Sequence, residues 1–324
     1  MILGLVEHDR GTLATPSLEM LTLARRLAED LDTPLEAVLI GNVARRLADT
    51  LSAYGVTAVH LIQHDRLDEY APEAWAESLV QLIDAGEPEA ILAAGTDWGH
   101  EVMAHVAARA NLPLATNCTK IRAGDVYEVT RLRWGGSLFE EARLKGEPKL
   151  LTVAPHAIAA ETAPADDQVV VEVFTPTLAE ATFRVRVTRR EMQQERTSLA
   201  DAKVVVGGGR GVGSEAGFAV LAELANLLGG VVGVSRVVTN AGWRPHCEQI
   251  GQTGTRIAPD IYIACGISGA VQHIVGCKGA KHILVINTDP HAPIIAKSDW
   301  AIIGDLHEVV PALSAAIRKA KQTS

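Results

Sequence analysis

Between Val204 and Leu306 the chain repeats one pattern, in which an apolar run ends in a loop of glycine and small polar residues. The segments that show it read VVVGGGRGVGS, VGVSR, EQIGQTG, CGISGAVQH, VINTDP and IIGDL. Runs rich in valine and isoleucine are typical of parallel strands buried on both faces. Because the carboxyl ends of parallel strands lie along one edge of a sheet, where ligands bind, the pattern predicts a shared binding site.

The glycine-rich loop Gly207–Gly213 follows a predicted strand over Val204–Val206, and Ser214 is predicted to N-cap a helix over residues 215–228. A strand, a glycine loop and a helix N-terminus together suit an anion such as phosphate. The dinucleotide spacing G-x-G-x-x-G is absent, however, because Val and Ser stand at positions 212 and 214, and the lysine of a Walker A loop is missing. A phosphate cradle and an ordinary turn therefore both remain open.

The next two loops are ambiguous when each is taken alone. Ser235 and Arg236 follow a predicted strand over Val231–Val234, and such a pair is commonly a turn with a solvated arginine. Gln249–Gly254 places glutamine and threonine between glycines, so that hydrogen-bond donors could approach a flat ligand. The same segment also fits a polar hairpin loop.

A fourth loop follows a predicted strand over Ile261–Cys265. Ser268 is predicted to N-cap a short helix over residues 269–276, with His273 in its second turn. A single histidine on a helix fits a structural role as well as a functional one.

Taken together, the segments GGRGVGS, VGVSR, QIGQTG, YIACGISGAVQH, VINTDPHAPI and GDL resemble the C-terminal domain of the α subunit of electron transfer flavoproteins. They occur in that family's order and spacing over at least Lys203–Leu313, although Thr255 stands where lysine is frequent and Gly207 extends the glycine run. The segments LPLATNCTKI and RLRWGG extend the resemblance more weakly toward the N-terminus. The resemblance implies an electron carrier that binds FAD and pairs with a β subunit.

The resemblance also implies which residues bind FAD. Arg210 would lie near the flavin, and Ser235 and Arg236 beside the flavin ring or the diphosphate. Gln252 and Thr253 would approach the isoalloxazine, with the Thr253 hydroxyl facing N5. The other implied contacts come from Ile250, Gly251, Ser268, Gly269, Ala270, Val271, Gln272, His273, Asn287, Asp305 and Leu306.

Some of these implied contacts also carry an electrostatic expectation. A reduced flavin gains negative charge around N1 and the C2 carbonyl, so a cationic His273, Arg236 and a helix N-terminus at Ser268 would each stabilise it. Asn287 and Asp305 match positions on the adenosine side. We expect no catalytic acid or base, since the redox chemistry belongs to the cofactor.

The N-terminal part alternates between strands and helices, as is typical of parallel βαβ units. Strands are predicted over residues 2–7, 35–40, 56–62, 90–94, 126–133, 149–153, 169–174 and 183–188, and helices over 17–31, 43–54, 72–85 and from the Gly95–Gly99 loop to about 110. A last helix is predicted over 306–321, with Pro311 inside it.

We therefore predict an α/β fold of two domains. Residues 1–190 form an N-terminal doubly wound, Rossmann-like scaffold, and residues 203–324 a C-terminal parallel α/β domain that binds FAD. Residues 191–202 are polar, lack an apolar period and are predicted to link the domains.

Composition excludes several classes of function. The net charge of −9 argues against nucleic acid as a partner. The four cysteines form no C-x-x-C pair, and His100 and His105 are five residues apart rather than four, so we expect no metal site. The chain shows neither an 18-residue apolar span nor a basic leader, which predicts a cytoplasmic protein.

The leading hypothesis is a subunit that carries electrons on FAD from a flavoprotein dehydrogenase, such as acyl-CoA dehydrogenase of fatty acid β-oxidation, to a quinone oxidoreductase at the membrane. An alternative within the same family is an electron-bifurcating protein that oxidises NADH with a second FAD associated with the β subunit. Two further alternatives are a flavin enzyme with its own organic substrate and a flavin-free nucleotide-binding module. The first of these needs an acid or base beside the flavin.

Overall fold

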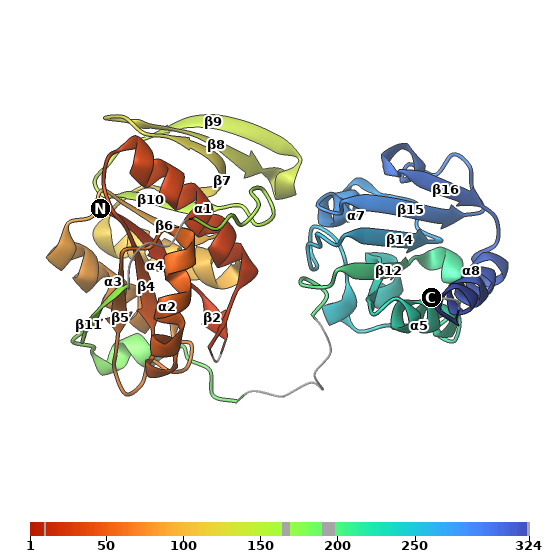
Figure 1. Ribbon diagram of the computed structural model, residues 1–324, viewed down its shortest axis with the longest axis horizontal. Helices are drawn as coiled ribbons and strands as arrows, with labels where there is room; N and C mark the ends of the chain where they lie inside the picture. The colour runs from red at the N-terminus through yellow and green to blue at the C-terminus, as the bar shows by residue number, and fades with distance from the viewer. Residues whose placement is uncertain (10, 164–168, 190–197, 323–324) are drawn as a thin grey trace. The chain divides into compact units, whose positions relative to one another are not determined.

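The structure is a computed structural model that describes residues 1–9, 11–163, 169–189 and 198–322. It divides into two units, Met1–Glu191 and Met192–Ser324, each with its own hydrophobic core (Figure 1). Residues 191–197 of the predicted linker lie outside the described residues. Leu199 and Ala202, which the linker prediction also included, are buried in a core of the second unit.

The first unit is built on a nine-stranded sheet with the order β11-β5-β4-β1-β6-β10-β7-β8-β9. Neighbouring strands are parallel from β11 to β7. The pairs β7–β8 and β8–β9 are antiparallel. The strands are β1 (Ile2–Leu5), β4 (Leu35–Ile40), β5 (Ala58–Ile62), β6 (Ala90–Ala94), β7 (Leu114–Arg122), β8 (Tyr127–Arg133), β9 (Leu138–Leu144), β10 (Lys149–Val153) and β11 (Val170–Phe174). A short hairpin of β2 (His8–Asp9) and β3 (Thr12–Leu13) follows β1.

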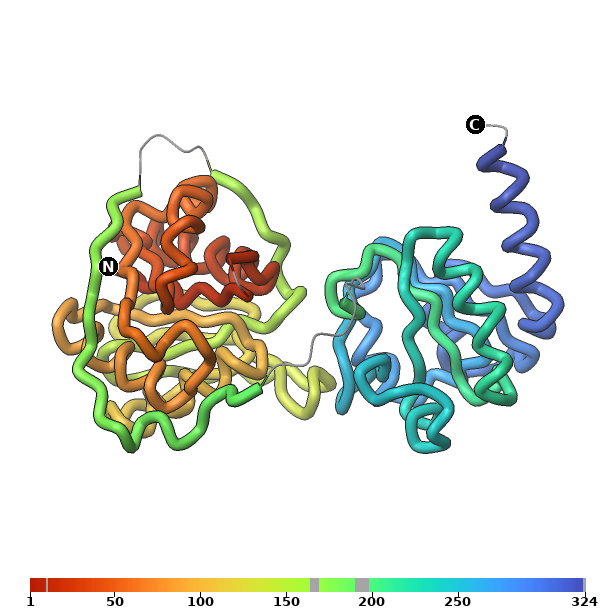
Figure 2. Tube along the Cα trace, turned by 90° about the horizontal axis from the view of Figure 1, so that it is seen from below, coloured from red at the N-terminus to blue at the C-terminus, as the bar shows by residue number. Residues whose placement is uncertain are grey.

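Helices cover both faces of this sheet. Helix α1 (Thr15–Asp30) and the short α2 (Ala48–Leu51) pack in one core, while α3 (Pro72–Gly86) and α4 (Asp97–Ala110) pack in the other. Figure 2 shows the two pairs of helices on opposite sides of the unit. The predicted doubly wound architecture is therefore confirmed.

Two predicted elements of this unit are wrong. Residues 183–188 form no strand, since Phe183 ends a 3-10 helix (Glu180–Phe183) and inserts into the core beneath the Arg66 guanidinium. The Val187 backbone N–H then donates to the Tyr70 carbonyl, so the segment follows the α3 side of the unit instead of adding to the sheet.

The second wrong element is the continuous helix expected over residues 43–54. The segment is instead a 3-10 helix (Asn42–Leu47), the single α-helical turn α2 and another 3-10 helix (Ser52–Tyr54). The buried residues Ala44 and Leu47 are three apart, which matches the tighter 3-10 period.

The strand order of the first unit reverses at β1, so the carboxyl ends of β1 and β6 are where an open α/β sheet commonly binds its ligand. Here the buried carboxyl of Glu7 lies at this position and accepts a 2.5 Å hydrogen bond from the Thr96 hydroxyl. Thr96 also N-caps α4 by accepting from the Gly99 N–H, and the Ser17 hydroxyl accepts from the Glu7 N–H. Burial raises the pKa of Glu7 to about 7. The Glu7 side chain therefore lies at the carboxyl ends of β1 and β6, where folds of this type commonly bind a ligand.

The second unit contains a five-stranded, fully parallel sheet with the order β13-β12-β14-β15-β16. Its strands are β12 (Val204–Gly208), β13 (Val231–Val234), β14 (Ile261–Cys265), β15 (His282–Asn287) and β16 (Trp300–Ile303). Helices α5 (Phe218–Leu227), α6 (Arg236–Asn240) and α8 (Leu306–Gln322) pack in one core, and α7 (Val271–Cys277) packs in the other. The predicted parallel α/β fold of this part of the chain is confirmed.

Two details concern the helices of this unit. Helix α5 begins at Phe218, not at residue 215, and its N-cap is Gly217. Ser214, the predicted N-cap, accepts a hydrogen bond from the Gly217 N–H because the chain turns once more before the helix begins. Pro311 lies inside α8 as predicted. No helix in the described ranges has the length and apolar character needed to span a bilayer.

Gly207 on β12 lies against the ring of Tyr262 on β14, which is fully buried. A Cβ atom at position 207 would meet the Tyr262 hydroxyl and lie 2.5 Å from its Cε2 atom. The extra glycine of this run is thus explained by packing between neighbouring strands.

We expect Glu7→Gln to remove a pH dependence of stability from the first unit. The folded pKa of about 7 exceeds the unfolded value of about 4.3, so the folded unit holds a proton that the unfolded chain releases between these values. Stability should therefore fall as pH rises from 5 to 8. Glu7→Gln should be more stable than the wild type at pH 8 by on the order of 2 kcal/mol.

Hydrogen exchange of peptides from β1 and β6, corrected for intrinsic rates, measures this effect. Glu29→Gln, which changes an exposed carboxylate on α1, is the control. An unchanged pH slope in Glu7→Gln would contradict the assignment.

We expect Gly207→Ala to destabilise the second unit by about 1–3 kcal/mol, because the new methyl group overpacks a site with no free volume. Faster hydrogen exchange of β12 and β14 measures the loss. Gly304→Ala is the matched control, since its Cβ would meet only Val309 Cγ2 at 3.2 Å. Equal exchange in the two variants would show that Tyr262 moves aside at little cost.

Candidate cofactor site

The carboxyl ends of the five strands in the second unit lie level with one another. Gly208 pairs with Val234 and with Cys265, Cys265 pairs with Ile286, and Asn287 pairs with Ile303. The loops that contain the predicted site residues follow these ends directly. The sheet therefore brings them to one edge, as the sequence pattern predicts.

The glycine loop after β12 is held against the loop after β14. The Gly209 N–H donates to the Cys265 carbonyl at 2.9 Å, and the Gly211 N–H donates to the Gly266 carbonyl at 3.0 Å. A Cβ atom at Gly211 would lie 2.7 Å from Gly266 Cα. These glycines allow two backbones to meet, while the Arg210 side chain between them is exposed.

The loop that contains Gln252 and Thr253 is tied to α7. The Gln252 N–H donates to the Gln272 carbonyl at 2.8 Å, and a Cβ atom at Gly251 would lie 3.0 Å from the same oxygen. Ile250 anchors the loop in the core by donating from its N–H to the Val234 carbonyl. The side chains of Gln252 and Thr253 are left exposed.

Helix α7 begins at Val271 and its N-cap is Ala270, so the predicted N-cap Ser268 is wrong. Gly269, at φ +85°, turns the chain and packs against the Ile294 backbone, while the Ser268 carbonyl accepts from the Ile294 N–H. The Ser268 side chain is therefore free of the helix and exposed at the edge.

His273 lies inside the unit rather than at its surface. Its Nε2 atom is 2.8 Å from the Tyr262 hydroxyl, and its side chain is 6% exposed. Burial raises the pKa of Tyr262 well above 10, so the tyrosine keeps its proton and its hydroxyl forms a hydrogen bond with the imidazole. Burial lowers the pKa of His273 to about 4, opposed only in part by the Ile250 backbone. Burial in the core therefore disfavours the cationic form of His273 that the resemblance implies.

Asn287 and Asp305 bind backbone groups of their own loops. The Asn287 amide donates to the Ile267 carbonyl at 2.9 Å and accepts from the Asp289 N–H at 3.1 Å. Asp305 accepts from the His307 N–H at 2.9 Å, and its side chain is exposed. Leu306, the residue after it, is buried with α5. Asn287 thus orders the edge, and Asp305 remains accessible.

The exposed groups of this edge fit a dinucleotide such as FAD in their chemistry. Arg210 and Arg236 supply two guanidinium groups that form no ion pair within the described ranges, which suits a diphosphate. Gln252, Thr253 and Gln272 supply neutral donors and acceptors, which suit the polar edge of a flavin ring. Val271, 65% exposed on the first turn of α7, adds an apolar surface among them.

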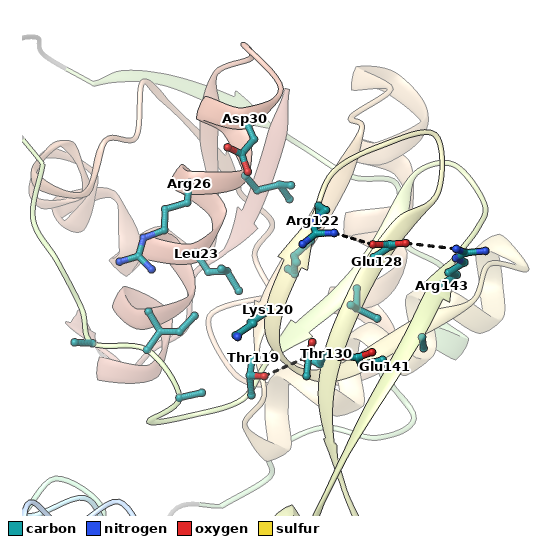
Figure 3. Close-up of a pocket in the computed structure, with 17 residues that line it drawn as sticks. Leu23, Arg26, Asp30, Thr119, Lys120, Arg122, Glu128, Thr130, Glu141 and Arg143 are labelled. Carbon is teal, nitrogen blue, oxygen red and sulfur yellow. Dashed lines mark hydrogen bonds and ion pairs between the residues drawn. The ribbon is translucent and has the colours of Figure 1, made fainter.

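A separate groove of about 1000 Å³ lies in the first unit between α1 and the antiparallel strands β7–β9 (Figure 3). Its wall carries both signs of charge. Glu128 lies 3.1 Å from Arg122 and 3.6 Å from Arg143, while Arg26 pairs with Glu161. None of the predicted site residues lines it, and its charges are largely compensated, so we do not assign the cofactor to this groove.

Two residues that support the edge, Gln249 and Tyr262, were not predicted. Gln249 is buried and its side chain contacts both Thr239 and Thr253, and Tyr262 holds His273. The signal was present for Gln249, because a polar residue directly before the apolar Ile250 must find hydrogen-bond partners if it is buried. No local pattern distinguishes Tyr262 from an ordinary strand residue.

We expect His273 to make the second unit less stable in acid. The folded pKa of about 4 lies below the unfolded value of about 6.5, so the unfolded chain binds a proton first as the pH falls. Stability should be complete above pH 6.5 and decrease toward pH 4. His273→Gln should flatten this slope in hydrogen exchange of β14, whereas the exposed-site control His246→Gln should keep it. An unchanged slope in His273→Gln would contradict the neutral buried imidazole.

Comparison with known proteins covers both units. Residues 2–179 match the family model described as the electron transfer flavoprotein domain. Residues 198–278 match the model described as the electron transfer flavoprotein FAD-binding domain. The second match contains the glycine loop, the Gln252–Thr253 loop and α7.

Individual relatives are similar over nearly the whole chain. The electron transfer flavoprotein subunit alpha of Thermoanaerobacterium thermosaccharolyticum is 35% identical over 97% of this chain and 97% of its own length. That of Mycobacterium leprae is 37% identical over 98% of each chain. Protein FixB of Bradyrhizobium diazoefficiens is 35% identical over 97% of this chain and 87% of its own length. The chain therefore belongs to the electron transfer flavoprotein α-subunit family, and its second unit is the family's FAD-binding domain.

Proposed function

We propose that this chain is the α subunit of a heterodimer that carries electrons on FAD from a flavoprotein dehydrogenase, such as acyl-CoA dehydrogenase, to a quinone oxidoreductase at the membrane. The observation that carries the proposal is the single edge of exposed donors in the second unit, within and beside the stretch that matches an FAD-binding domain. The partner of the heterodimer is the family's β subunit, which the name "subunit alpha" of the relatives supports.

The proposed contacts divide by chemistry. The charged and hydroxyl groups of Arg210, Ser235 and Arg236 suit the diphosphate, because guanidinium groups bind phosphate oxygens in a planar, bidentate way. Gln252, Thr253 and the residues around the start of α7 suit the flavin ring. Ser268, Asn287 and Asp305 complete the edge toward the strand β16.

When bound, FAD supplies reversible one- and two-electron chemistry, so the chain itself needs no acid or base. Its residues bind, orient and shield. With FAD bound, Val271 would exclude water from one side of the ring, and the Thr253 hydroxyl would hydrogen-bond its polar edge. His273 is buried and, through its contact with Tyr262, helps to hold α7 at this edge.

The neutral His273 also bears on the rival function, a flavin enzyme with its own substrate. Such an enzyme needs a group beside the ring that moves a proton near neutral pH. The pKa of about 4 and the contact with Tyr262 remove His273 from that role. An electron carrier is therefore the better fit.

We expect the heterodimer of this chain with its β subunit to be yellow, with one FAD bound by the α subunit. Arg236→Ala should weaken FAD binding about tenfold or more, because one charge-assisted contact to a phosphate contributes about 1.5–3 kcal/mol. Arg66→Ala, which removes an arginine paired with Glu180 in the first unit, is the control. Absorbance and fluorescence titration of the flavin-free protein measure the affinities.

Flavin content per heterodimer distinguishes the alternatives. One FAD that is reduced by an acyl-CoA dehydrogenase and reoxidised by a quinone oxidoreductase supports the proposal. Two FAD molecules and direct reduction by NADH indicate the bifurcating alternative. A colourless heterodimer, or rapid reduction of the flavin by an organic substrate without a dehydrogenase, would refute the electron-carrier function.

A further inference from the structure

We propose that Gln249 is a positioning residue that sets the direction in which the Thr253 hydroxyl donates its proton. Gln249 is 2% exposed, yet its side chain joins two surface groups. Its Oε1 atom is 2.7 Å from the Thr239 hydroxyl on α6, and its Nε2 atom is 3.1 Å from the Thr253 hydroxyl. The inference rests on the proposed function, in which Thr253 lies beside the flavin ring.

The backbone of Gln249 leaves its side chain little freedom. Its N–H donates to the His246 carbonyl at 2.9 Å, and its carbonyl accepts from the Thr255 N–H at 2.7 Å. A Cβ atom at Gly254 would lie 2.8 Å from the Gln249 carbonyl carbon, so the loop closes tightly around this residue. The backbone of Gln249 is therefore fixed, and its side-chain amide connects Thr239 on α6 to Thr253 in the loop.

The direction of the chain follows from donor and acceptor capacity. The amide nitrogen only donates, so its bond to Thr253 occupies an oxygen lone pair and leaves the Thr253 proton free. Thr253 is exposed, so that proton is available to an acceptor outside the buried amide. Thr253 is thereby made a hydrogen-bond donor to whatever accepts there.

The hydrogen bonds among Thr239, Gln249 and Thr253 can also be arranged in the opposite direction. The Thr239 hydroxyl is also 2.9 Å from the Arg236 carbonyl, and its one proton serves either that oxygen or the Gln249 amide. Turning the amide by half a rotation reverses the chain: Nε2 donates to Thr239, and Thr253 donates to Oε1. The hydrogen bond from Nε2 to the Thr253 oxygen is the arrangement that leaves the Thr253 proton for an acceptor at the edge.

This positioning has a consequence for a flavin at the edge. An oxidised flavin ring presents hydrogen-bond acceptors, and negative charge grows on it as electrons arrive. A directed hydroxyl donor stabilises that charge, whereas a hydroxyl free to rotate or turned toward Oε1 stabilises it less. Gln249 therefore favours reduction of the flavin without touching it.

The test uses the heterodimer and a double-mutant cycle. Gln249→Met keeps the shape of the side chain and removes both hydrogen bonds, and should shift the first one-electron equilibrium of the flavin about tenfold toward the oxidised form, or about 59 mV. In the Thr253→Val background the same substitution should shift it little, because the hydroxyl it directs is gone. Gln81→Met, which removes hydrogen bonds to Glu77 and Thr177 in the first unit, is the matched control.

A potential that does not change in Gln249→Met, or that changes equally with and without the Thr253 hydroxyl, overturns the inference. If Gln249→Met does not fold, Thr239→Val and Thr239→Ser replace it. The valine variant should show the shift, and the serine variant, which keeps the hydroxyl, should restore the wild-type potential.

A second measurement needs no flavin. In the flavin-free chain, the side-chain NH₂ signals of Gln249 in ¹⁵N NMR should be protected from exchange and should move in Thr239→Val and Thr253→Val. Fast exchange and unchanged shifts would overturn the hydrogen-bond chain itself. A colourless wild-type heterodimer would instead count against the proposed function, while the NMR result still decides the inference.

Discussion

The hydrogen bond between Tyr262 and His273 is the contact on which the geometry of the FAD-binding unit depends. It joins β14 to α7 inside the core, and it lies directly beneath Gly207 of β12. Helix α7 in turn holds the loop of Gln252 through the Gln272 carbonyl. One buried polar pair thus connects β14 to α7 and, through α7, to the loop of Gln252. A buried hydrogen-bonded pair of this kind tolerates little displacement.

The carboxyl edges of the two sheets differ in whether their polar side chains are buried or exposed. In the first unit, the Thr96 hydroxyl accepts from the Gly99 N–H at the start of α4 and donates to the buried Glu7 carboxyl, so these side chains hydrogen-bond within the protein at that point. In the second unit, the corresponding loops turn their glycines against one another and leave Arg210, Arg236 and Thr253 exposed. The same topological rule therefore produces a self-contained scaffold in one case and a cofactor edge in the other.

The sequence predicts most of the fold because its signals are local. Buried runs such as Ile261–Cys265 and the glycines after them are visible in the sequence itself. Both sheets form, although the strands β7 and β9 of the first sheet were not predicted. The helix starts fail at Ser214 and Ser268, since serine also stabilises turns that precede a helix. The strand expected after Phe183 fails because a β-like pattern does not reveal whether a neighbouring strand is available.

The charge state of His273 could not be predicted from the sequence for a different reason. A motif states which residue stands near a cofactor, but a pKa depends on burial, and burial depends on residues far along the chain. Here burial of the imidazole in the core, beside Tyr262, lowers the pKa of His273 and disfavours its charged form. Positive charge at the edge then comes from the exposed guanidinium groups of Arg210 and Arg236. The proposed binding of an anionic cofactor therefore depends on these exposed guanidinium groups, while the buried His273 contributes to the pH dependence of the stability of the unit.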